Sequence, residues 1–392
     1  MKKWLFIFAC ALPVMLMLTF CGNGQHQKNG QAPPTPSCNF YYWKTSLDFD
    51  KADKALADSL GLRKLYVRYF DVDWSPTLNM PVPLGELSEE WERSIVWGNH
   101  TIHIQDLQMV PTVFLTNRVF AQAIDVDSLA AKMTRKIKDI TDGFQYSIAP
   151  GWGPDYDNAE ASSNWQIQDS LVETAHQKFL ARMTEIQVDC DWTPTTKDRY
   201  FAFLKAMKNQ NPGIDITCTV RLHQFRDRDR SGIPPVDRAT LMCYNVAPPK
   251  DPGVADAIFD EKLVAGYLKN GKYPLPLEAA LPLFGWGALF HENEFKGLAS
   301  GLTEKDVKGN PLFAEAGENR YRFTQDTVFA EIYMREGDMV RLDAPSATEL
   351  EELAAHLAGI GAVQGLSFFD WDMDKIHSYH VDKIVKKFSD AK

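Results

Sequence analysis

Apolar and polar side chains alternate strictly in the segment that runs from Glu185 to Asp191. Ile186, Val188 and Cys190 fall on one face of the β-strand that this alternation predicts. The other face carries Glu185, Gln187, Asp189 and Asp191. Unpaired carboxylates are too costly to bury in an ordinary sheet sandwich. A (β/α)8 barrel accepts such a strand, because its apolar face packs under helices and its carboxyl end opens onto a solvated mouth.

The rest of the chain alternates between short apolar runs, typical of strands, and amphipathic segments, typical of helices. The other strand-like runs are residues 40–44, 64–70, 110–116, 215–222, 240–246, 277–284 and 365–370. The helical segments are residues 51–60, 127–140, about 166–183, one that begins at Thr195 or Thr196, 346–359 and one that ends near residue 388. Eight strands in alternation with helices predict an α/β fold, a single (β/α)8 TIM barrel over residues 38–390.

The stretch of residues 291–345 follows the seventh predicted strand and is too long for a plain loop. Residues 327–334 and 339–343 have strand-like composition, and residues 335–338 between them favour a turn, so they predict a β-hairpin. We therefore expect a small α+β lobe inserted after strand seven. A second long stretch, residues 143–165, is rich in aromatic residues, glycine and proline.

The beginning of the chain has the order of a targeting segment. Two lysines precede an apolar run that ends at Phe20, and Cys21 follows, so residues 1–21 predict a signal peptide. Residues 18–21, Leu-Thr-Phe-Cys, resemble a bacterial lipoprotein cleavage site, and this resemblance implies that Cys21 carries lipid. Phe20 replaces the small residue usual before that cysteine, and plain secretion stays an alternative. Residues 22–37 predict a flexible tether. The expected location is the bacterial cell envelope, on the periplasmic face of the outer membrane, with the lipid as the only membrane contact.

The net charge and the cysteine and histidine positions limit the classes of partner and cofactor that we expect. The chain of 392 residues carries a formal charge of −10, which argues against nucleic acid, since phosphate binding needs a concentrated basic face. Cys190, Cys218 and Cys243 fall at helix-facing positions of three strands and read as small buried apolar residues, not as a disulfide framework. The cysteine and histidine spacings of known metal sites are missing from the sequence, so we expect neither a metal nor another cofactor.

Reactive groups of a barrel sit at the carboxyl ends of its strands. The candidate catalytic carboxylates at these ends are Asp189, Asp191, Asp370 and Asp372. The candidate substrate-binding residues are Asn117, Arg221, His223, Tyr244, Asn245, Trp286 and Trp371. Aromatic faces stack on sugar rings, polar side chains bind sugar hydroxyls, and paired carboxylates supply an acid and a base. This mixture predicts a glycan as the ligand or substrate.

Structural roles compete with these functional ones. Asp189 is deep enough in its strand to be a buried, hydrogen-bonded scaffold residue. Trp192 follows the strand, and we favour packing under a helix over contact with sugar. His223 points inward, but a lone histidine is more often a structural donor than a catalyst.

Four short motifs carry a resemblance to a known family. They are Asp189-x-Asp191-Trp192, Met242-x-Tyr244-Asn245, residues 281–285 and residues 365–369. They resemble the signatures of strands four, six, seven and eight in glycoside hydrolase family 18, the chitinase-like barrels, and that family often carries an insertion after strand seven. The chain also resembles a group of bacterial lipoprotein barrels marked by a Gln-x-Asp-x-Asp-Trp/Ala strand. The resemblance implies a barrel that acts on glycans.

The departures from that family are as informative. Thr193 stands where the family has its catalytic glutamate, and a threonine cannot protonate a glycosidic oxygen in that role. Ile186 replaces the family's first aspartate, Asn245 replaces an aspartate, and Phe369 replaces a tryptophan. The family's mechanism therefore cannot simply be transferred to this chain.

Three functions stay open on the sequence. The first is a glycoside hydrolase-like enzyme that acts on an envelope or scavenged glycan, with Asp191 positioned by Asp189 and with Asp370 or Asp372 as the second carboxyl group. The second is a carbohydrate-binding barrel that has lost its chemistry. The third is an envelope scaffold lipoprotein, which we favour least because neighbouring carboxylates are electrostatically expensive in an incidental groove.

Overall fold

The computed structural model describes residues 38–88, 104, 106–144, 165–269 and 271–392. The predicted signal peptide, the lipid anchor at Cys21 and the tether lie outside the described residues, as does most of the aromatic-rich stretch 143–165. Within the described part of the chain, no helix is long and apolar enough to cross a membrane.

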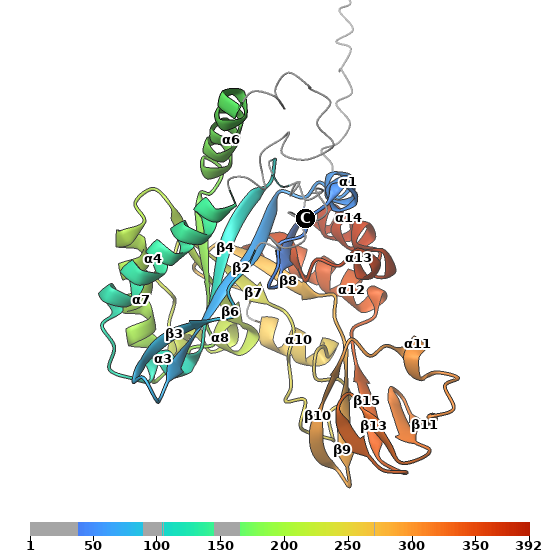
Figure 1. The fold of residues 1–392 in the computed structure, drawn as a ribbon. Helices are drawn as coiled ribbons and strands as arrows, with labels where there is room; N and C mark the ends of the chain where they lie inside the picture. The colour runs from blue at the N-terminus through green and yellow to red at the C-terminus, as the bar shows by residue number, and fades with distance from the viewer. Residues whose placement is uncertain (1–37, 89–103, 105, 145–164, 270) are drawn as a thin grey trace, which may run out of the picture. The chain divides into compact units, whose positions relative to one another are not determined.

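Eight parallel strands form the centre of the described part (Figure 1). In chain order they are β1 (Asn39–Tyr42), β2 (Lys64–Ser75), β4 (Gln108–Leu115), β5 (Glu185–Asp189), β6 (Asp215–Arg221), β7 (Arg238–Met242), β8 (Leu277–Pro282) and β16 (Val363–Phe369). Each pairs with its neighbour in sequence order, and β1 pairs with both β16 and β2, which closes the sheet. The predicted (β/α)8 barrel is confirmed, and every predicted strand corresponds to one of these eight.

The predicted helices also form. They are α1 (Lys51–Ser59), α4 (Val126–Gly143), α6 (Trp165–Leu180), α7 (Lys197–Gln210), α12 (Ala347–Ala358) and α14 (Val381–Ala391). Ser346 and Glu349 form the capping box that begins α12. Several shorter helices have no predicted counterpart: α3 (Asn117–Phe120), α8 (Leu222–Arg226), α9 (Arg228–Ser231), α10 (Glu261–Leu268) and α13 (Met373–Ser378). Two of these, α3 and α8, begin within two residues of a strand's end and therefore reshape the rim of the barrel.

The strand β2 continues beyond its predicted end at residue 70. Residues Asp71–Ser75 pair antiparallel with β3 (Met80–Leu84) and form a hairpin. Asp73 of this hairpin accepts hydrogen bonds from Thr116 and Arg118 at the end of β4. The acidic pair Asp71 and Asp73 thus belongs to the hairpin.

An inserted lobe follows β8, as predicted. Its antiparallel sheet has the order β10 (Glu294–Ser300), β9 (Trp286–His291), β15 (Met339–Asp343), β12 (Arg320–Phe323) and β11 (Phe313–Gly317), with the short helix α11 (Glu304–Val307). The lobe has its own apolar core, which includes Leu289, Phe323 and Val340. It begins at Trp286, five residues before the expected boundary at residue 291.

The predicted hairpin between residues 327–334 and 339–343 is wrong. Residues 327–334 fold back on themselves as β13 (Thr327–Phe329) and β14 (Ile332–Met334). Ala330 and Glu331 both have positive φ, of 48° and 64°, which is the geometry of a two-residue hairpin turn. The strand β15 pairs instead with β9 and β12, where Val340 and Leu342 join the lobe core.

The alternation of β5 separates the helix side of the barrel wall from its interior. Gln187 points inward, because its side chain accepts from the Tyr41 hydroxyl (2.7 Å) and donates to Thr240 (3.1 Å), which lie on β1 and β7. Cys190, Cys218 and Cys243 are free thiols and are buried, as predicted. Trp192 is also buried and stacks on Tyr200 of α7, so the favoured interpretation of this tryptophan is confirmed.

Candidate functional site

A cavity of about 540 Å³ opens at the carboxyl ends of β5, β6 and β7, against the first residue of β9. The cavity is lined by Asp191, Trp192, Thr193, Arg221, Leu222, His223, Tyr244, Asn245, Val246, Ala247, Pro248, Pro249, Tyr267 and Trp286. We call it the rim cavity. It brings together six of the residues proposed from the sequence, namely Asp191, Arg221, His223, Tyr244, Asn245 and Trp286.

Asp191 and Arg221 form a two-pronged ion pair in the rim cavity. The guanidinium of Arg221 donates through Nε (2.5 Å) and Nη2 (2.9 Å) to the two carboxylate oxygens. Burial opposes the charge of Arg221, but the hydrogen bond and the charge of Asp191 outweigh it and raise the pKa of the guanidinium. Such pairs are rigid and directional. The Arg221 backbone is held as well, because its N–H donates to Gln224, whose side-chain amide donates to the Trp192 carbonyl.

Asp189 lies one layer deeper, with 6% of its surface exposed. The Thr219 hydroxyl donates to it at 2.6 Å. Burial raises the pKa of Asp189 to about 6, although the charge of Arg221 opposes the shift. The carboxyl group is therefore buried and hydrogen-bonded, as the scaffold interpretation requires, and it is also able to hold a proton near neutral pH.

Aromatic rings pack around Tyr244 and Trp286, two of the residues that line the rim cavity. Tyr244 packs edge-on to Phe284, with ring centroids 5.5 Å apart, and Phe284 packs on Trp286 at 5.6 Å. Phe369 lies 5.8 Å from Tyr244 and 5.5 Å from Trp43. The Tyr244 hydroxyl is buried and has no hydrogen-bond partner among the described residues. A ligand hydroxyl or a water molecule in the cavity would satisfy it.

Trp43, Phe284 and Phe369 were not proposed as site residues, and they support the site by packing rather than by lining the rim cavity. Each is half-buried, and each lies at or just after the carboxyl end of β1, β8 or β16. Their position at strand ends was the signal that could have identified them, because it is the same signal that identified Trp286.

The inserted lobe builds one wall of the rim cavity. The Trp286 indole donates to Asp343 at 2.9 Å, and Asp343 forms a fully buried ion pair with Arg341. Arg341 also donates to the carbonyl oxygens of Pro249 (3.1 Å) and Asp251 (2.6 Å). Because Pro249 and Trp286 both line the cavity, this buried pair fixes the loop after β7 and the indole in one arrangement.

The carboxylates of strand eight do not line the rim cavity. Asp370 lies 3.6 Å from the Lys375 ammonium, and burial raises its pKa while Lys375 opposes the shift. Asp372 is the N-cap of α13 and accepts from the Lys375 backbone N–H at 3.1 Å. The structure therefore does not bring the proposed second carboxyl group into the cavity that holds Asp191.

Two further candidates also lie elsewhere. Trp371 is 1% exposed, and its indole donates to Asp53 of α1 at 2.7 Å. Its prediction as a sugar-stacking residue is wrong, because the chain turns inward after β16 and buries the ring against Phe40 and Phe49. Asn117 accepts a hydrogen bond of 2.5 Å from Thr196 and so joins the end of β4 to the start of α7.

Thr193 lines the rim cavity at the position where the resemblance expects a glutamate. Its hydroxyl lies 2.9 Å from that of Thr195 and 3.2 Å from that of Thr196. The residue therefore belongs to the polar turn that precedes α7.

Comparisons with known proteins gave matches among solved structures. No family model and no curated protein matches the chain. The spore cortex-lytic enzyme SleL of Bacillus cereus is 15% identical, covers 90% of this chain and 75% of its own, and has a TM-score of 0.45. The catalytic domain of psychrophilic chitinase B from Arthrobacter TAD20 is 10% identical, covers 91% of this chain and 96% of its own, and has a TM-score of 0.44.

A glycoside hydrolase family 18 N-acetylglucosaminidase from Paenibacillus barengoltzii is also similar, at 10% identity and a TM-score of 0.41, with 90% of this chain and 99% of the other covered. These solved structures and the motif resemblance both involve chitinase-like proteins.

Proposed function

We propose that this protein binds a carbohydrate in the rim cavity and does not cleave it. The observation that carries the proposal is the Asp191–Arg221 pair, which presents fixed acceptors and donors beside the half-buried ring of Trp286. A sugar offers hydroxyl groups to such a pair and apolar C–H faces to an indole. A volume of about 540 Å³ is in the range of ordinary small-ligand sites.

Binding without cleavage follows from the carboxylates. Glycoside hydrolysis by the usual route needs two carboxyl groups that flank the scissile bond. Among the described residues that line the rim cavity, Asp191 is the one carboxylate, and Arg221 engages both of its oxygens. Both oxygens of this carboxylate are therefore occupied as hydrogen-bond acceptors, which leaves it poorly placed to act on a glycosidic oxygen. Thr193 offers a hydroxyl in place of an acid.

A glycoside hydrolase is the second candidate, and one observation favours it. Asp189 has its pKa raised to about 6 by burial, and it is the last residue of β5, two positions before Asp191. A carboxyl group with such a pKa exchanges a proton near neutral pH. In this candidate Asp189 would be the proton store and Asp191 the charge that stabilises the transition state.

Calorimetry and a reducing-end assay with the same oligosaccharides separate the two candidates. The resemblance and the expected envelope location make oligomers of N-acetylglucosamine and peptidoglycan fragments the first probes. We expect saturable binding to the wild type, a loss of about tenfold or more in affinity for Asp191→Asn, and no turnover by either protein. Asp227→Asn is the matched control, because Asp227 forms an exposed pair with Arg226 outside the rim cavity.

Turnover by the wild type that falls by about 10²–10⁴-fold in Asp191→Asn would instead establish the hydrolase. Thr193→Glu is the companion variant, since it restores the carboxylate that the chitinase-like pattern has. An absence of both binding and turnover with every probe would contradict the rim cavity as a glycan site.

We also propose that the protein is anchored in the envelope by lipid at Cys21. Its support is the order of lysines, apolar run, cysteine and polar linker in the sequence. Mass spectrometry of the mature amino terminus tests the anchor. An acylated Cys21 is the expected result, and an unmodified terminus downstream of Cys21 would contradict it.

A further inference from the structure

The residues that line the rim cavity fall into two unlike groups. One group is polar and centres on the ion pair of Asp191 and Arg221, at the ends of β5 and β6. The other is a run of four consecutive lining residues in the loop after β7, residues 246–249, with the sequence Val-Ala-Pro-Pro. We call this run the apolar loop. It presents apolar surface to the same cavity that holds the ion pair.

The backbone of the apolar loop has few polar groups free for a ligand. Pro248 and Pro249 have no backbone N–H. The N–H of Ala247 donates to the Ala257 carbonyl (3.2 Å), and the Pro248 carbonyl accepts from the Asp251 N–H (3.1 Å). A sugar hydroxyl that left water to face this loop would lose hydrogen bonds that the loop replaces poorly, whereas an apolar group would lose none.

Two arginines of the inserted lobe hold the loop that contains these residues. Arg341 of β15 donates to the Pro249 carbonyl at 3.1 Å. Arg320 of β12 donates to the carbonyl oxygens of Pro252 and Val254, both at 2.9 Å. Neither arginine lines the rim cavity. The apolar loop is therefore fixed before any ligand arrives, and a preformed surface binds a ligand without the cost of ordering a loop.

Helix α10 extends the apolar surface away from the cavity. Tyr267 of this helix lines the cavity, and the guanidinium of Arg226 lies over its ring, 4.7 Å from the centroid. Leu263 precedes Tyr267 by four residues and therefore lies on the same face of the helix. The Leu263 side chain is 43% exposed, although it is large and apolar. An apolar strip thus leads from the cavity lining to the surface of α10.

We propose that the ligand of the rim cavity is a glycan that carries an apolar substituent, such as an alkyl chain. Its sugar binds at the pair of Asp191 and Arg221. Its substituent lies on the apolar loop and leaves the cavity along Tyr267 and Leu263. The inference rests on the proposed glycan binding and adds the class of glycan, which is amphiphilic.

Calorimetry of the full chain with two glycosides of N,N′-diacetylchitobiose tests the proposal. One glycoside carries a methyl group at its reducing end and the other an octyl chain, and both are used below the concentration at which the octyl glycoside forms micelles. The sugar is the same in both, so the ratio of the two affinities reports on the substituent alone. We expect the octyl glycoside to bind about tenfold or more tighter, because its chain leaves water on binding.

Variants along the apolar strip assign this gain to the proposed path. Leu263→Ser and Tyr267→Ser should each lower the ratio of the two affinities by about threefold or more, since each removes apolar surface. Leu78→Ser is the matched control, because Leu78 is also exposed, at 62%, but lies in the turn between β2 and β3, and the ratio should stay unchanged. Asp191→Asn should weaken the binding of both glycosides, because the chain binds as part of the glycan.

Three outcomes would overturn the proposal. Equal affinities for the methyl and octyl glycosides would show that the rim cavity takes no apolar substituent, and the proposed glycan binding would still stand. A ratio that neither Leu263→Ser nor Tyr267→Ser changes would place the chain elsewhere, as would octyl glycoside binding that Asp191→Asn leaves at full strength. If neither glycoside binds, the glycan site itself is contradicted. Should Tyr267→Ser fail to fold, Leu263→Ser still decides the path, since its side chain is exposed.

Discussion

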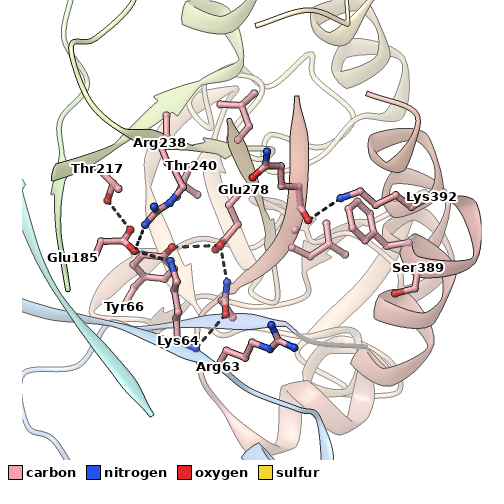
Figure 2. Close-up of a pocket in the computed structure, with 17 residues that line it drawn as sticks. Arg63, Lys64, Tyr66, Glu185, Thr217, Arg238, Thr240, Glu278, Ser389 and Lys392 are labelled. Atoms are coloured by element: carbon pink, nitrogen blue, oxygen red, sulfur yellow. Dashed lines mark hydrogen bonds and ion pairs between the residues drawn. The ribbon is translucent and has the colours of Figure 1, made fainter. Parts of the chain in front are cut away.

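Each end of the barrel holds a cavity of about 540 Å³, the rim cavity at the carboxyl ends of the strands and the basal cavity at their amino ends (Figure 2), and the two are lined differently. The strand β5 reaches both of them. At its start, Glu185 is 1% exposed and has two cationic partners and a hydroxyl donor. Just beyond its end, Asp191 is 45% exposed and has Arg221 as its cationic partner. Two tryptophans, Trp192 and Trp286, line the rim cavity, whereas the aromatic residues that line the other cavity are Tyr66 and Phe388.

The difference follows from how each end is built. The basal cavity draws most of its wall from strand residues, which the sheet holds in place. The rim cavity draws its wall from segments that follow the strands, and the buried pair Arg341–Asp343 must fix these to the inserted lobe. Cavity volume alone therefore says little about function in a barrel, and the chemistry of the lining decides what each end can bind.

The largest expected effect is on stability, at the base. Glu185→Gln leaves Lys64 and Arg238 without their shared carboxylate, and breaking a buried pair in this way costs about 3–5 kcal/mol. Because both cations keep some exposure, we expect a loss of about 3 kcal/mol in the free energy of unfolding, measured by urea denaturation.

Asp215→Asn is the matched control for Glu185→Gln. Asp215 is the other carboxylate partner of Arg238, and its own side chain is 47% exposed, so its loss should cost about 1 kcal/mol or less. Equal losses of unfolding free energy in the two variants would show that the buried carboxylate of Glu185 contributes no more than the exposed one of Asp215. That result would contradict the contrast drawn between the two ends.

The second prediction concerns pH at the base. Burial raises the pKa of Glu278 from 4.5 to about 7, against the opposing charge of Lys64. Between these two values the folded protein keeps a proton that the unfolded chain has released, so the stability contributed through Glu278 falls as pH rises. The change amounts to about 1.4 kcal/mol for each unit by which the pKa is raised.

Glu278→Gln should remove this slope. The difference in unfolding free energy between Glu278→Gln and the wild type should shift in favour of the variant as pH rises from about 4.5 to 7. Glu352→Gln, at an exposed position of α12, neutralises a glutamate away from both cavities and serves as the control. Parallel curves for Glu278→Gln and the wild type would contradict the prediction.

The third prediction tests the aromatic side of the rim. Trp286→Leu keeps an apolar side chain but removes the ring and the hydrogen bond to Asp343. An aromatic contact contributes about 0.5–1.5 kcal/mol beyond its buried area, so glycan affinity should fall about tenfold or less, as measured by calorimetry. Tyr333→Leu, which removes an exposed ring of the lobe, is the control.

The barrel itself was predictable because its strands are local patterns. All eight lie within a few residues of their predicted ranges, since each is a short buried run bounded by polar residues. The pairing in the lobe was not predictable in the same way. The strand β15 pairs with β9, more than forty residues earlier in the chain, and no local pattern specifies that partner over β14.

The candidate site was predictable only in part. Residues within or immediately after strands, such as Arg221 and Tyr244, lie in the rim cavity as proposed. Alternation stops where a strand stops, and for this reason it could not place Trp371, which is buried under α1. The basal cavity was missed although a signal existed. Polar residues occupy the first or second position of several strands. Because these residues are far apart in the sequence, local patterns did not show that they line one cavity.

The smallest expected effect is at the barrel wall between the two ends. Cys218 and Cys243 are buried under helices, and burial raises the pKa of Cys243 to about 12 and that of Cys218 still further. Because the thiolate is the reactive form, native protein should react with a thiol reagent slowly, and equally slowly with a glycan present. Mass spectrometry after timed labelling gives the rates, and denaturant should make them fast. Ser300→Cys, an exposed position of the lobe, is the positive control. Rapid native labelling of Cys218 or Cys243 would mean that the wall opens, and the two ends would then not be independent sites.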